Sequence, residues 1–375
     1  MINYRVFHRI GSPVAEIGYG MWGMGGWTGS DDAESLRSLR RAIELGCTFF
    51  DTAWIYGQGR SERLLGQTIA SHKGVPLVVA TKIPPKNLRW PAKDTYSIDE
   101  TYPPDHIRAY TEKSLENLGV DTIDLQQFHV WSDTWADDDG WQRAIEDLRE
   151  AGLVRAVGIS INRWEPENVL RALDTGLIDC VQVVHNIFDQ APEETLFPYC
   201  QQHDIAVISR VPFDEGSLTG TLTADSHWPE GDFRNLYFTK ETLPETLARV
   251  ERLEQLVPTG MDLPELALRF ILAHPAVGTV IPGMRRTAHV ERNLAASDGA
   301  ALPPRRAHDV ERVGDEVRCD RHIAHHALRG DEFRGAENRL HLRLRAARGA
   351  VDDFEFLRAL GVVHRDEIQI GRAHV

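Results

Sequence analysis

Short apolar runs alternate with amphipathic segments along most of this chain. The runs, which predict β-strands, are residues 17–20, 47–51, 77–82, 123–129, 154–160, 180–185, 205–211 and 277–281. Apolar residues at three- and four-residue spacing predict helices between them, at residues 32–45, 61–69, 105–118, 140–151, 166–173, 243–256 and 263–272. Strands that alternate with helices are typical of a parallel sheet.

Eight such alternations favour an α/β fold of the (β/α)8 TIM-barrel type over a doubly wound sheet. A β-hairpin is expected ahead of the barrel, at residues 4–15. The seventh unit is the least regular, because a long loop at residues 216–240 precedes its helices. Long loops at the open end of a barrel are usually functional.

Three consecutive predicted strands end on side chains that can take part in proton transfer. Asp51, Lys82 and His129 close these strands, and Tyr56 follows five residues after Asp51. In a barrel such strand ends converge on one face. A nearby ammonium can lower the pKa of a phenol by roughly 1–3 units, and a carboxylate is the natural counter-ion of a buried lysine. An imidazole can orient a carbonyl oxygen.

Each of these residues also has a purely structural interpretation. Asp51 could cap a turn, Lys82 could be a solvated strand exit, and His129 could be a satisfied core residue. Their occurrence in order, at successive strand ends, favours proton transfer to or from a carbonyl oxygen beside a hydride transfer.

The composition of the chain argues against some classes of binding partner. A formal net charge of -14 opposes binding to nucleic acid or to an anionic membrane surface. No apolar run approaches the roughly 20 residues that span a bilayer, so a soluble cytoplasmic protein is expected. The cysteines, at positions 47, 180, 200 and 319, show no CxxC spacing and are expected to be buried thiols, neither disulfides nor metal ligands.

The motif DTAWIYG at residues 51–57, followed by TK at 81–82 and DLQQFHVWSD at 124–133, resembles the aldo-keto reductases. Matching motifs run from about Tyr4 to about Asn293. The resemblance implies reversible NADPH-dependent reduction of an aldehyde or ketone to the alcohol, with Tyr56 as general acid. It implies NADPH/NADP+ as the cofactor and a small-molecule carbonyl as the substrate.

The chain has no GxGxxG motif and hence no ordinary Rossmann site. Segments in its second half instead resemble the family's GVSN, QxxYN, pyrophosphate-loop and 2′-phosphate segments. The cofactor-binding residues that the resemblance implies are Ser160, Asn162, Gln182, Arg210, Val211, Pro212, Phe213, Gly216, Leu218, Gly283, Arg285, Arg286, His289 and Asn293.

Three positions depart from the family pattern. Ile161 separates Ser160 from Asn162, His185 stands where a tyrosine is usual, and Arg210 stands where an aromatic ring usually stacks on the nicotinamide. A planar guanidinium can also lie on a ring, and the alternative for Arg210 is a salt bridge at the pocket rim.

Tryptophans are the candidates for the substrate pocket. Trp22, Trp54 and Trp131 are expected to line it, with Trp90 a weaker candidate, which suggests an aromatic or apolar aldehyde. A small sugar-derived carbonyl is the alternative substrate. Alternative functions are an NADPH-binding regulatory module resembling channel beta subunits, and a non-redox barrel lyase or isomerase.

Residues 1–301 are expected to form the barrel, because the predicted eighth helix ends near Ala296. Residues 302–375 are rich in arginine and histidine, lack lysine, tyrosine and tryptophan, and show no βα pattern. We expect an atypical tail outside the barrel, from a frameshift or read-through. The alternative is a genuine helical appendage.

Overall fold

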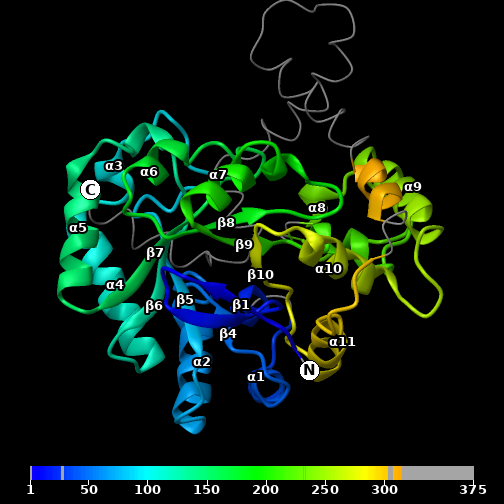
Figure 1. The fold of residues 1–375 in the computed structure, drawn as a ribbon, viewed down its shortest axis with the longest axis horizontal. Helices are drawn as coiled ribbons and strands as arrows, with labels where there is room; N and C mark the ends of the chain where they lie inside the picture. Colours follow the sequence, from blue (N-terminus) through cyan, green and yellow to red (C-terminus); the bar gives the residue numbers. More distant parts are fainter. Residues whose placement is uncertain (1, 27–28, 231, 233, 303–306, 315–375) are drawn as a thin grey trace, which may run out of the picture.

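The computed structural model describes residues 2–26, 29–230, 232, 234–302 and 307–314. Within this part of the chain eight parallel strands form one sheet, in the order β10-β9-β8-β7-β6-β5-β4-β3. Parallel bridges from Ile17 to Val280 and from Gly20 to Gly283 join the two outer strands, so the sheet closes on itself. The helices lie around it (Figure 1). The predicted (β/α)8 barrel is therefore confirmed.

The barrel strands are β3 (Tyr19–Gly20), β4 (Phe49–Asp51), β5 (Val78–Ile83), β6 (Ile123–Phe128), β7 (Val154–Ser160), β8 (Cys180–Val184), β9 (Ala206–Arg210) and β10 (Val277–Val280). The predicted hairpin is also confirmed, as β1 (Tyr4–Phe7) paired antiparallel with β2 (Ser12–Ala15).

The α-helices are α1 (Asp32–Glu44), α2 (Arg60–Ser71), α3 (Ile98–Thr101), α4 (Pro104–Leu118), α5 (Asp139–Glu150), α6 (Leu170–Asp174), α7 (Leu196–His203), α8 (Arg234–Tyr237), α9 (Thr242–Glu254), α10 (Leu263–Ala273) and α11 (Thr287–Ala295). Short 3-10 helices are η1 (Trp22–Met24), η2 (Asp133–Trp135), η3 (Ala191–Glu193) and η4 (Asp214–Thr219). Carboxylates cap several helices: Asp31, Asp138 and Asp262 each accept a backbone N–H of the following turn.

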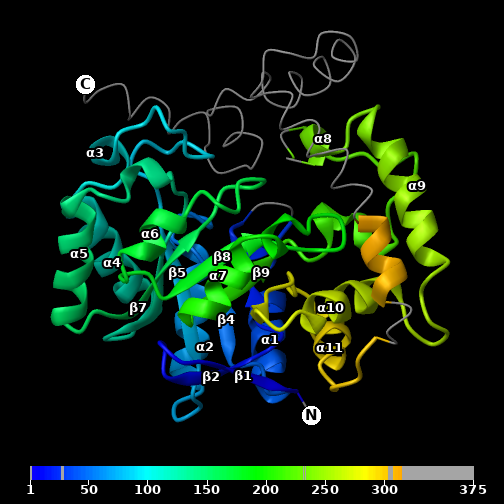
Figure 2. The same ribbon diagram turned by 45° about the horizontal axis from the view of Figure 1, so that its top comes forward.

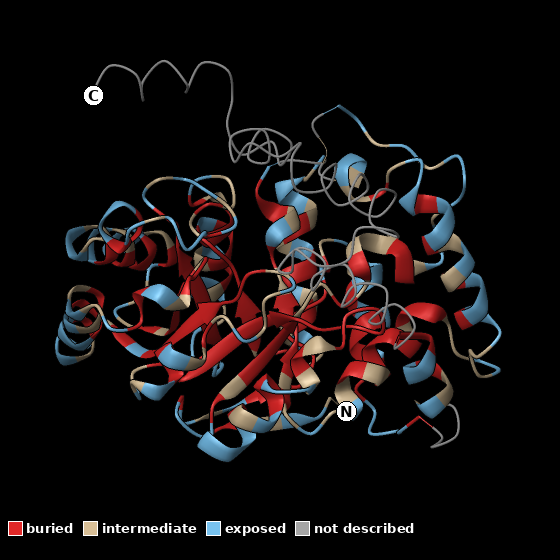
Figure 3. Cartoon of the chain, turned by 90° about the horizontal axis from the view of Figure 1, so that it is seen from above, coloured by how far each residue is buried: buried red, intermediate tan, exposed pale blue. Residues whose placement is uncertain are grey.

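Most core side chains lie between the barrel and its helices, where strands are buried on both faces (Figure 3). A smaller cluster fills the lower barrel interior and includes Phe7 from the hairpin and Phe49 from β4, whose ring centroids are 6.0 Å apart. A Cβ at Gly278 would lie 2.1 Å from the Phe7 ring, so only glycine leaves room there. The hairpin thus plugs the N-terminal end of the barrel.

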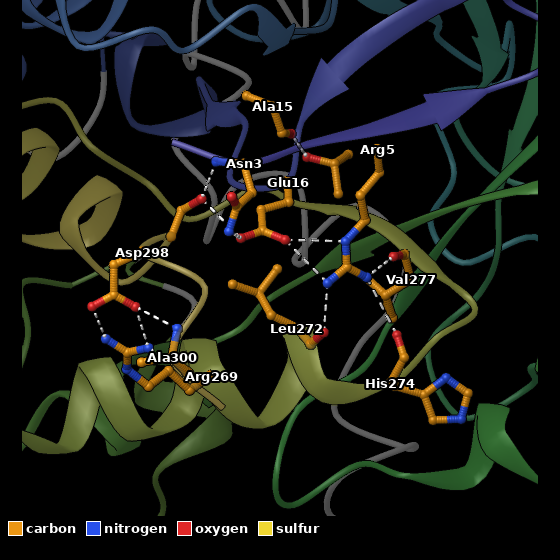
Figure 4. A network of polar contacts seen from close by, with 12 residues as sticks. Asn3, Arg5, Ala15, Glu16, Arg269, Leu272, His274, Val277, Asp298 and Ala300 are labelled. Atoms are coloured by element: carbon orange, nitrogen blue, oxygen red, sulfur yellow. Dashed lines mark hydrogen bonds and ion pairs between the residues drawn. The ribbon is translucent and has the colours of Figure 1, made fainter. Parts of the chain in front are cut away.

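Arg5 fastens this plug to the barrel (Figure 4). Its guanidinium pairs with Glu16 at 3.1 Å and donates to the backbone carbonyls of Leu272, His274 and Val277. These carbonyls belong to the end of α10 and the start of β10, where orphan acceptors need donors. Because the hairpin closes the N-terminal end of the barrel, a binding or catalytic site is expected at the C-terminal end.

The packed chain extends further than expected. Residues 307–314 are helical and lie beside α9 and α10 (Figure 2, orange). Leu302, Val310 and Val313 are buried in a second apolar cluster together with Leu218. These three apolar side chains lie beyond the predicted end of the barrel at residue 301, and they complete this cluster. The rest of the predicted tail, residues 315–375, lies outside the described residues.

Cys47, Cys180 and Cys200 are buried free thiols, as predicted, whereas Cys319 lies outside the described residues. Among the helices that the structure describes, none is long and apolar enough to cross a membrane.

Candidate active site

The four predicted proton-transfer residues meet at the C-terminal end of the barrel. Asp51 is the last residue of β4, Lys82 lies near the end of β5, and His129 follows β6. The Lys82 Nζ lies 2.6 Å from the Asp51 Oδ1 and also donates to the Thr52 carbonyl at 2.8 Å. Both charged side chains are almost fully buried, so each is compensated by the other.

Tyr56 lies above this ion pair. The Lys82 Nζ is 5.3 Å from the centroid of the Tyr56 ring, and the rings of Tyr56 and His129 are 5.8 Å apart, edge to face. A phenol, an ammonium and an imidazole thus surround one position at the barrel mouth.

The pKa of Tyr56 differs in direction from the expectation. Burial raises the pKa of the phenol above its usual value, and the positive charge of Lys82 is the strongest influence that opposes this rise. The Asp51 carboxylate raises the pKa further and Arg210 lowers it. The positive charge of Lys82 therefore offsets only part of the effect of burial, and the phenol stays protonated at neutral pH.

The pKa of His129 lies well below its usual value, because the ring is buried and faces the charges of Lys82 and Arg210. The imidazole is therefore neutral at neutral pH and can hydrogen-bond without adding charge. Its Nδ1 has no hydrogen-bond partner within the described structure. Trp90 stands edge-on to the same ring at 5.6 Å.

The second carboxylate oxygen of Asp51 is also occupied. Its Oδ2 accepts from Gln182 Nε2 at 2.8 Å and from Gln127 Nε2 at 3.2 Å. Gln182 was predicted to bind the cofactor and also takes part in this contact, whereas Gln127 was not predicted. Strand alternation could have indicated Gln127, because it lies two residues before His129 and faces the same side.

Ser160 and Gln182 are direct neighbours across β7 and β8 and are both buried, as a shared site requires. Asn162 follows in the next loop and donates from Nδ2 to the Ala92 carbonyl and to Glu165. Its Oδ1 is buried and has no partner in the described structure. His185 instead packs against Phe197 and donates from Nε2 to Glu193, so it is part of the core behind the sheet.

The loop after β9 has an unusual backbone. Val211 adopts φ 56°, and Gly216 adopts φ 110°, which favours glycine. Asn186 Nδ2 holds the Val211 carbonyl, and Leu218 anchors the far end of the loop in the second apolar cluster. Pro212 is buried and Phe213 is partly buried against the core.

Arg163, which was not predicted, holds this loop by its acidic residues. It pairs with Asp214 at 3.1 Å and Glu215 at 3.0 Å, and donates to the Tyr237 hydroxyl at 2.8 Å. Asp214 and Glu215 both have positive φ values. The guanidinium therefore ties together the loops after β7 and β9 and helix α8. No local sequence signal links Arg163 to Tyr237, which lies 74 residues away.

Arg210 ends β9 and donates from Nη2 to the Ile161 carbonyl at 3.0 Å. Its Nε is buried without a partner in the described structure, and its charge acts on Tyr56 and His129. It therefore reaches the centre of the site, and neither of its two sequence interpretations is contradicted.

Positive groups gather where α11 begins. Arg286 is the N-cap residue of α11, and burial together with the charge of Arg286 lowers the pKa of Arg285. Burial and both arginines also lower the pKa of His289. Gly283 is exposed just before them, and Asn293 is buried within the helix. Clustered cations at a helix N-terminus are suited to a phosphate.

The tryptophans considered for the substrate pocket lie in different surroundings. Trp22 is 43% exposed after β3, and Trp54 stands edge-on to Tyr110 at 4.7 Å. Trp131 is fully buried among Phe128 and other core rings, so its position does not fit a pocket wall. The less favoured Trp90 instead reaches His129. The number of residues after a strand end does not fix the direction of a side chain. For this reason the sequence favoured Trp131 over Trp90.

Within the described residues no cluster of histidine, cysteine and carboxylate side chains could hold a metal ion.

Comparison with known proteins matches residues 16–314 to a model of the Aldo/keto reductase family. The aldo-keto reductase YhdN of Bacillus subtilis is 31% identical over 297 residues, which cover 77% of this chain and 87% of that protein. The aldo-keto reductase yakc [NADP(+)] of Schizosaccharomyces pombe is 29% identical, covering 76% and 84%. The structure of the glycerol dehydrogenase AKR11B4 from Gluconobacter oxydans superposes with a TM-score of 0.70 at 28% identity, covering 83% and 94%.

Proposed function

The chain belongs to the aldo/keto reductase family and is an NADP-dependent oxidoreductase, and from this premise we propose that it reduces an aldehyde or ketone to the alcohol with Tyr56 as general acid. The observation that carries the proposal is the arrangement of Tyr56 beside the buried Lys82–Asp51 pair and the neutral His129.

The residues divide the work by charge. NADPH, when bound, supplies the hydride to the carbonyl carbon. Tyr56 stays protonated until negative charge develops on the carbonyl oxygen, and then donates its proton there. Lys82 stabilises the phenolate that remains, and Asp51 keeps Lys82 in place. His129, as a neutral imidazole, donates a hydrogen bond that orients the oxygen.

The described structure leaves atoms that suit a nicotinamide carboxamide. Asn162 Oδ1 is a buried acceptor without a partner there, and Ser160, two residues earlier, is the cross-strand neighbour of Gln182. A carboxamide needs both donors and acceptors, which these three side chains offer. Arg285 and Arg286 would hold an adenosine 2′-phosphate, and the loop of residues 210–218 would lie against the pyrophosphate.

We assign the carbonyl substrate to the aromatic or apolar class. Trp90 beside His129 offers flat apolar surface near the reacting position, and Trp22 is exposed after β3. Apolar rings bind aromatic substrates by burial and stacking, whereas a small sugar-derived carbonyl would need more hydrogen-bonding groups. A cytoplasmic location stays a prediction.

The test is turnover of NADPH with a panel of aromatic, aliphatic and sugar-derived aldehydes, followed by absorbance. Tyr56→Phe keeps the ring and removes the proton donor, so kcat should fall by roughly 10²–10⁴ with NADPH affinity nearly unchanged. Tyr199→Phe, which removes an exposed hydroxyl bonded to Asp174, is the matched control.

Near-normal turnover of Tyr56→Phe would contradict its role as the acid. Tight NADPH binding without turnover of any carbonyl would instead indicate the regulatory binding module.

A further inference from the structure

The buried Asp51 carboxylate makes three side-chain contacts, and only one of them is to a charge. Oδ1 is taken by Lys82, whereas Oδ2 is taken by the amides of Gln127 and Gln182. Hydrogen bonds to the charged form of a buried carboxylate stabilise that form. The two glutamines therefore stabilise the negative charge on the carboxylate oxygen that Lys82 does not contact.

Gln127 is fully buried and is built into this position. It pairs in register with Lys82 on one side and with Gly158 on the other. A Cβ at position 158 would lie 3.1 Å from the Gln127 Cγ, so a larger residue in β7 would crowd the amide. Because Gly158 has no side chain, the space beside β7 is open to the side chain of Gln127.

The amide of Gln127 also has a fixed orientation. Its Nε2 donates to Asp51, and its Oε1 accepts from Gln182 Nε2 at 3.4 Å. An amide flipped end for end would turn its oxygen toward the carboxylate. The contact with Gln182 thus favours the orientation in which Gln127 donates to Asp51.

We propose that Gln127 is a positioning residue for proton transfer, which holds Asp51 so that the full charge of Lys82 acts on Tyr56. The inference rests on the proposed function. Without the Gln127 donor the Asp51 carboxylate is less compensated, and its negative field reaches the phenol more strongly. Tyr56 then becomes a weaker acid.

The charged and titratable groups that face Tyr56 are Asp51, Lys82, Arg210 and His129. Asp51 raises the pKa of the phenol, and Lys82 and Arg210 lower it. Loss of the Gln127 amide leaves these four groups in place. It removes a hydrogen bond that stabilises the Asp51 carboxylate, which is the group that raises the pKa of Tyr56. The pKa of Tyr56 is therefore expected to rise when the Gln127 amide is removed.

The neighbouring Gln126 supplies a matched control. It lies in the same strand and is equally buried, but it donates to Thr111 of α4 at 3.3 Å, on the opposite face. Gln127→Leu and Gln126→Leu each remove one buried amide, but only the amide of Gln127 contacts Asp51. Gln127→Glu keeps the size of the side chain and places a second carboxyl beside Asp51, so it tests the same point if the leucine variant fails to fold.

Two measurements are compared in the wild type and in each variant. The first is the pH dependence of kcat for carbonyl reduction, together with NADPH affinity by fluorescence titration. The second is the tyrosinate absorbance titration of the protein without cofactor, from which the same titration of a Tyr56→Phe counterpart is subtracted. The difference isolates Tyr56 and does not require turnover.

We expect Gln127→Leu to raise the apparent pKa of Tyr56 by about one unit and to lower kcat about 10-fold, with NADPH affinity retained. Gln127→Glu should raise the pKa at least as far, because two carboxylates then share one site. Gln126→Leu should leave the pKa of Tyr56 unchanged.

An unchanged pKa of Tyr56 in both Gln127 variants, or an equal shift in Gln126→Leu, overturns the inference while the proposed function stands. A wild type that reduces no carbonyl overturns the proposed function, and the absorbance titration then still decides whether Gln127 acts on Tyr56.

Discussion

The strands β4 to β6 and the segments after β7 to β10 form two halves of the same barrel mouth, and they are built in different ways. In the first half Asp51 and Lys82 leave the strands directly and form a buried ion pair at 2.6 Å, and Gln127 donates a hydrogen bond to the same carboxylate. In the second half the backbone turns through positive φ at Val211, and Asn162 retains a buried oxygen without a partner in the described structure.

The difference separates chemistry from binding. Groups that transfer a proton need a fixed field, and rigid strand ends provide it without help from a ligand. Groups that hold a cofactor must exchange partners when it arrives, so loops with unfilled hydrogen bonds are suited to them. Variants in the first half should therefore change kcat, and variants in the second half should change cofactor affinity.

The largest expected effect is that of Lys82→Met. Turnover should fall by roughly 10²–10⁴, because the phenolate of Tyr56 loses its stabilising charge. The free energy of unfolding should also fall by about 3–5 kcal/mol, because Asp51 is left buried and unpaired. Urea titration should show recovery of stability, but not of turnover, when Asp51→Asn is added. Lys86→Met, at an exposed lysine beyond β5, is the control.

The next largest effect is expected from truncation, which removes apolar contacts from the half of the barrel mouth that would hold the cofactor. A chain that ends at Gly314 should unfold like the full chain, whereas one that ends at Ala301 loses the burial of Leu302, Val310 and Val313. Each fully buried side chain of this kind contributes roughly 1.5–3 kcal/mol. The shorter chain should unfold at lower urea and bind NADPH more weakly, since Leu218 loses its neighbours. Equal unfolding midpoints would contradict this role.

The preference for NADPH over NADH tests the two arginines at the start of α11, in the same half of the barrel mouth. Combining Arg285→Ala with Arg286→Ala should weaken NADPH binding 10-fold or more, since a charge-assisted hydrogen bond contributes roughly 1.5–3 kcal/mol. NADH lacks the 2′-phosphate, so its dissociation constant should not change. Arg292→Ala, on the same helix but paired with Asp262, is the control. Equal dissociation constants of the wild type for both cofactors would show that neither arginine reads the phosphate.

The smallest effect, about 10-fold in NADPH affinity, is expected for Arg163→Met, because the ion pairs that hold Asp214 and Glu215 are lost. Because Arg163 lies outside the proton-transfer cluster, kcat at saturating NADPH should change less than the affinity. Arg171→Met, which breaks an exposed pair with Asp137, should change neither. A variant with reduced kcat and unaltered affinity would blur the distinction between the two halves.

The sequence alone determined the features that depend on local order. Apolar runs of strand length alternating with helical periodicity were sufficient for the barrel, because each βα unit is recognisable within its own residues. Asp51, Lys82 and His129 could be placed together for the same reason, since parallel strands align their ends whatever surrounds them.

Only the tertiary structure decided what depends on contacts between distant segments. It buried Trp131 and turned Trp90 toward His129, and it paired Arg163 with a loop some fifty residues later. It also carried the packed chain past residue 302, by docking residues 307–314 on α9 and α10. A local pattern gives the spacing of side chains, whereas their partners are set by the packing of the whole barrel.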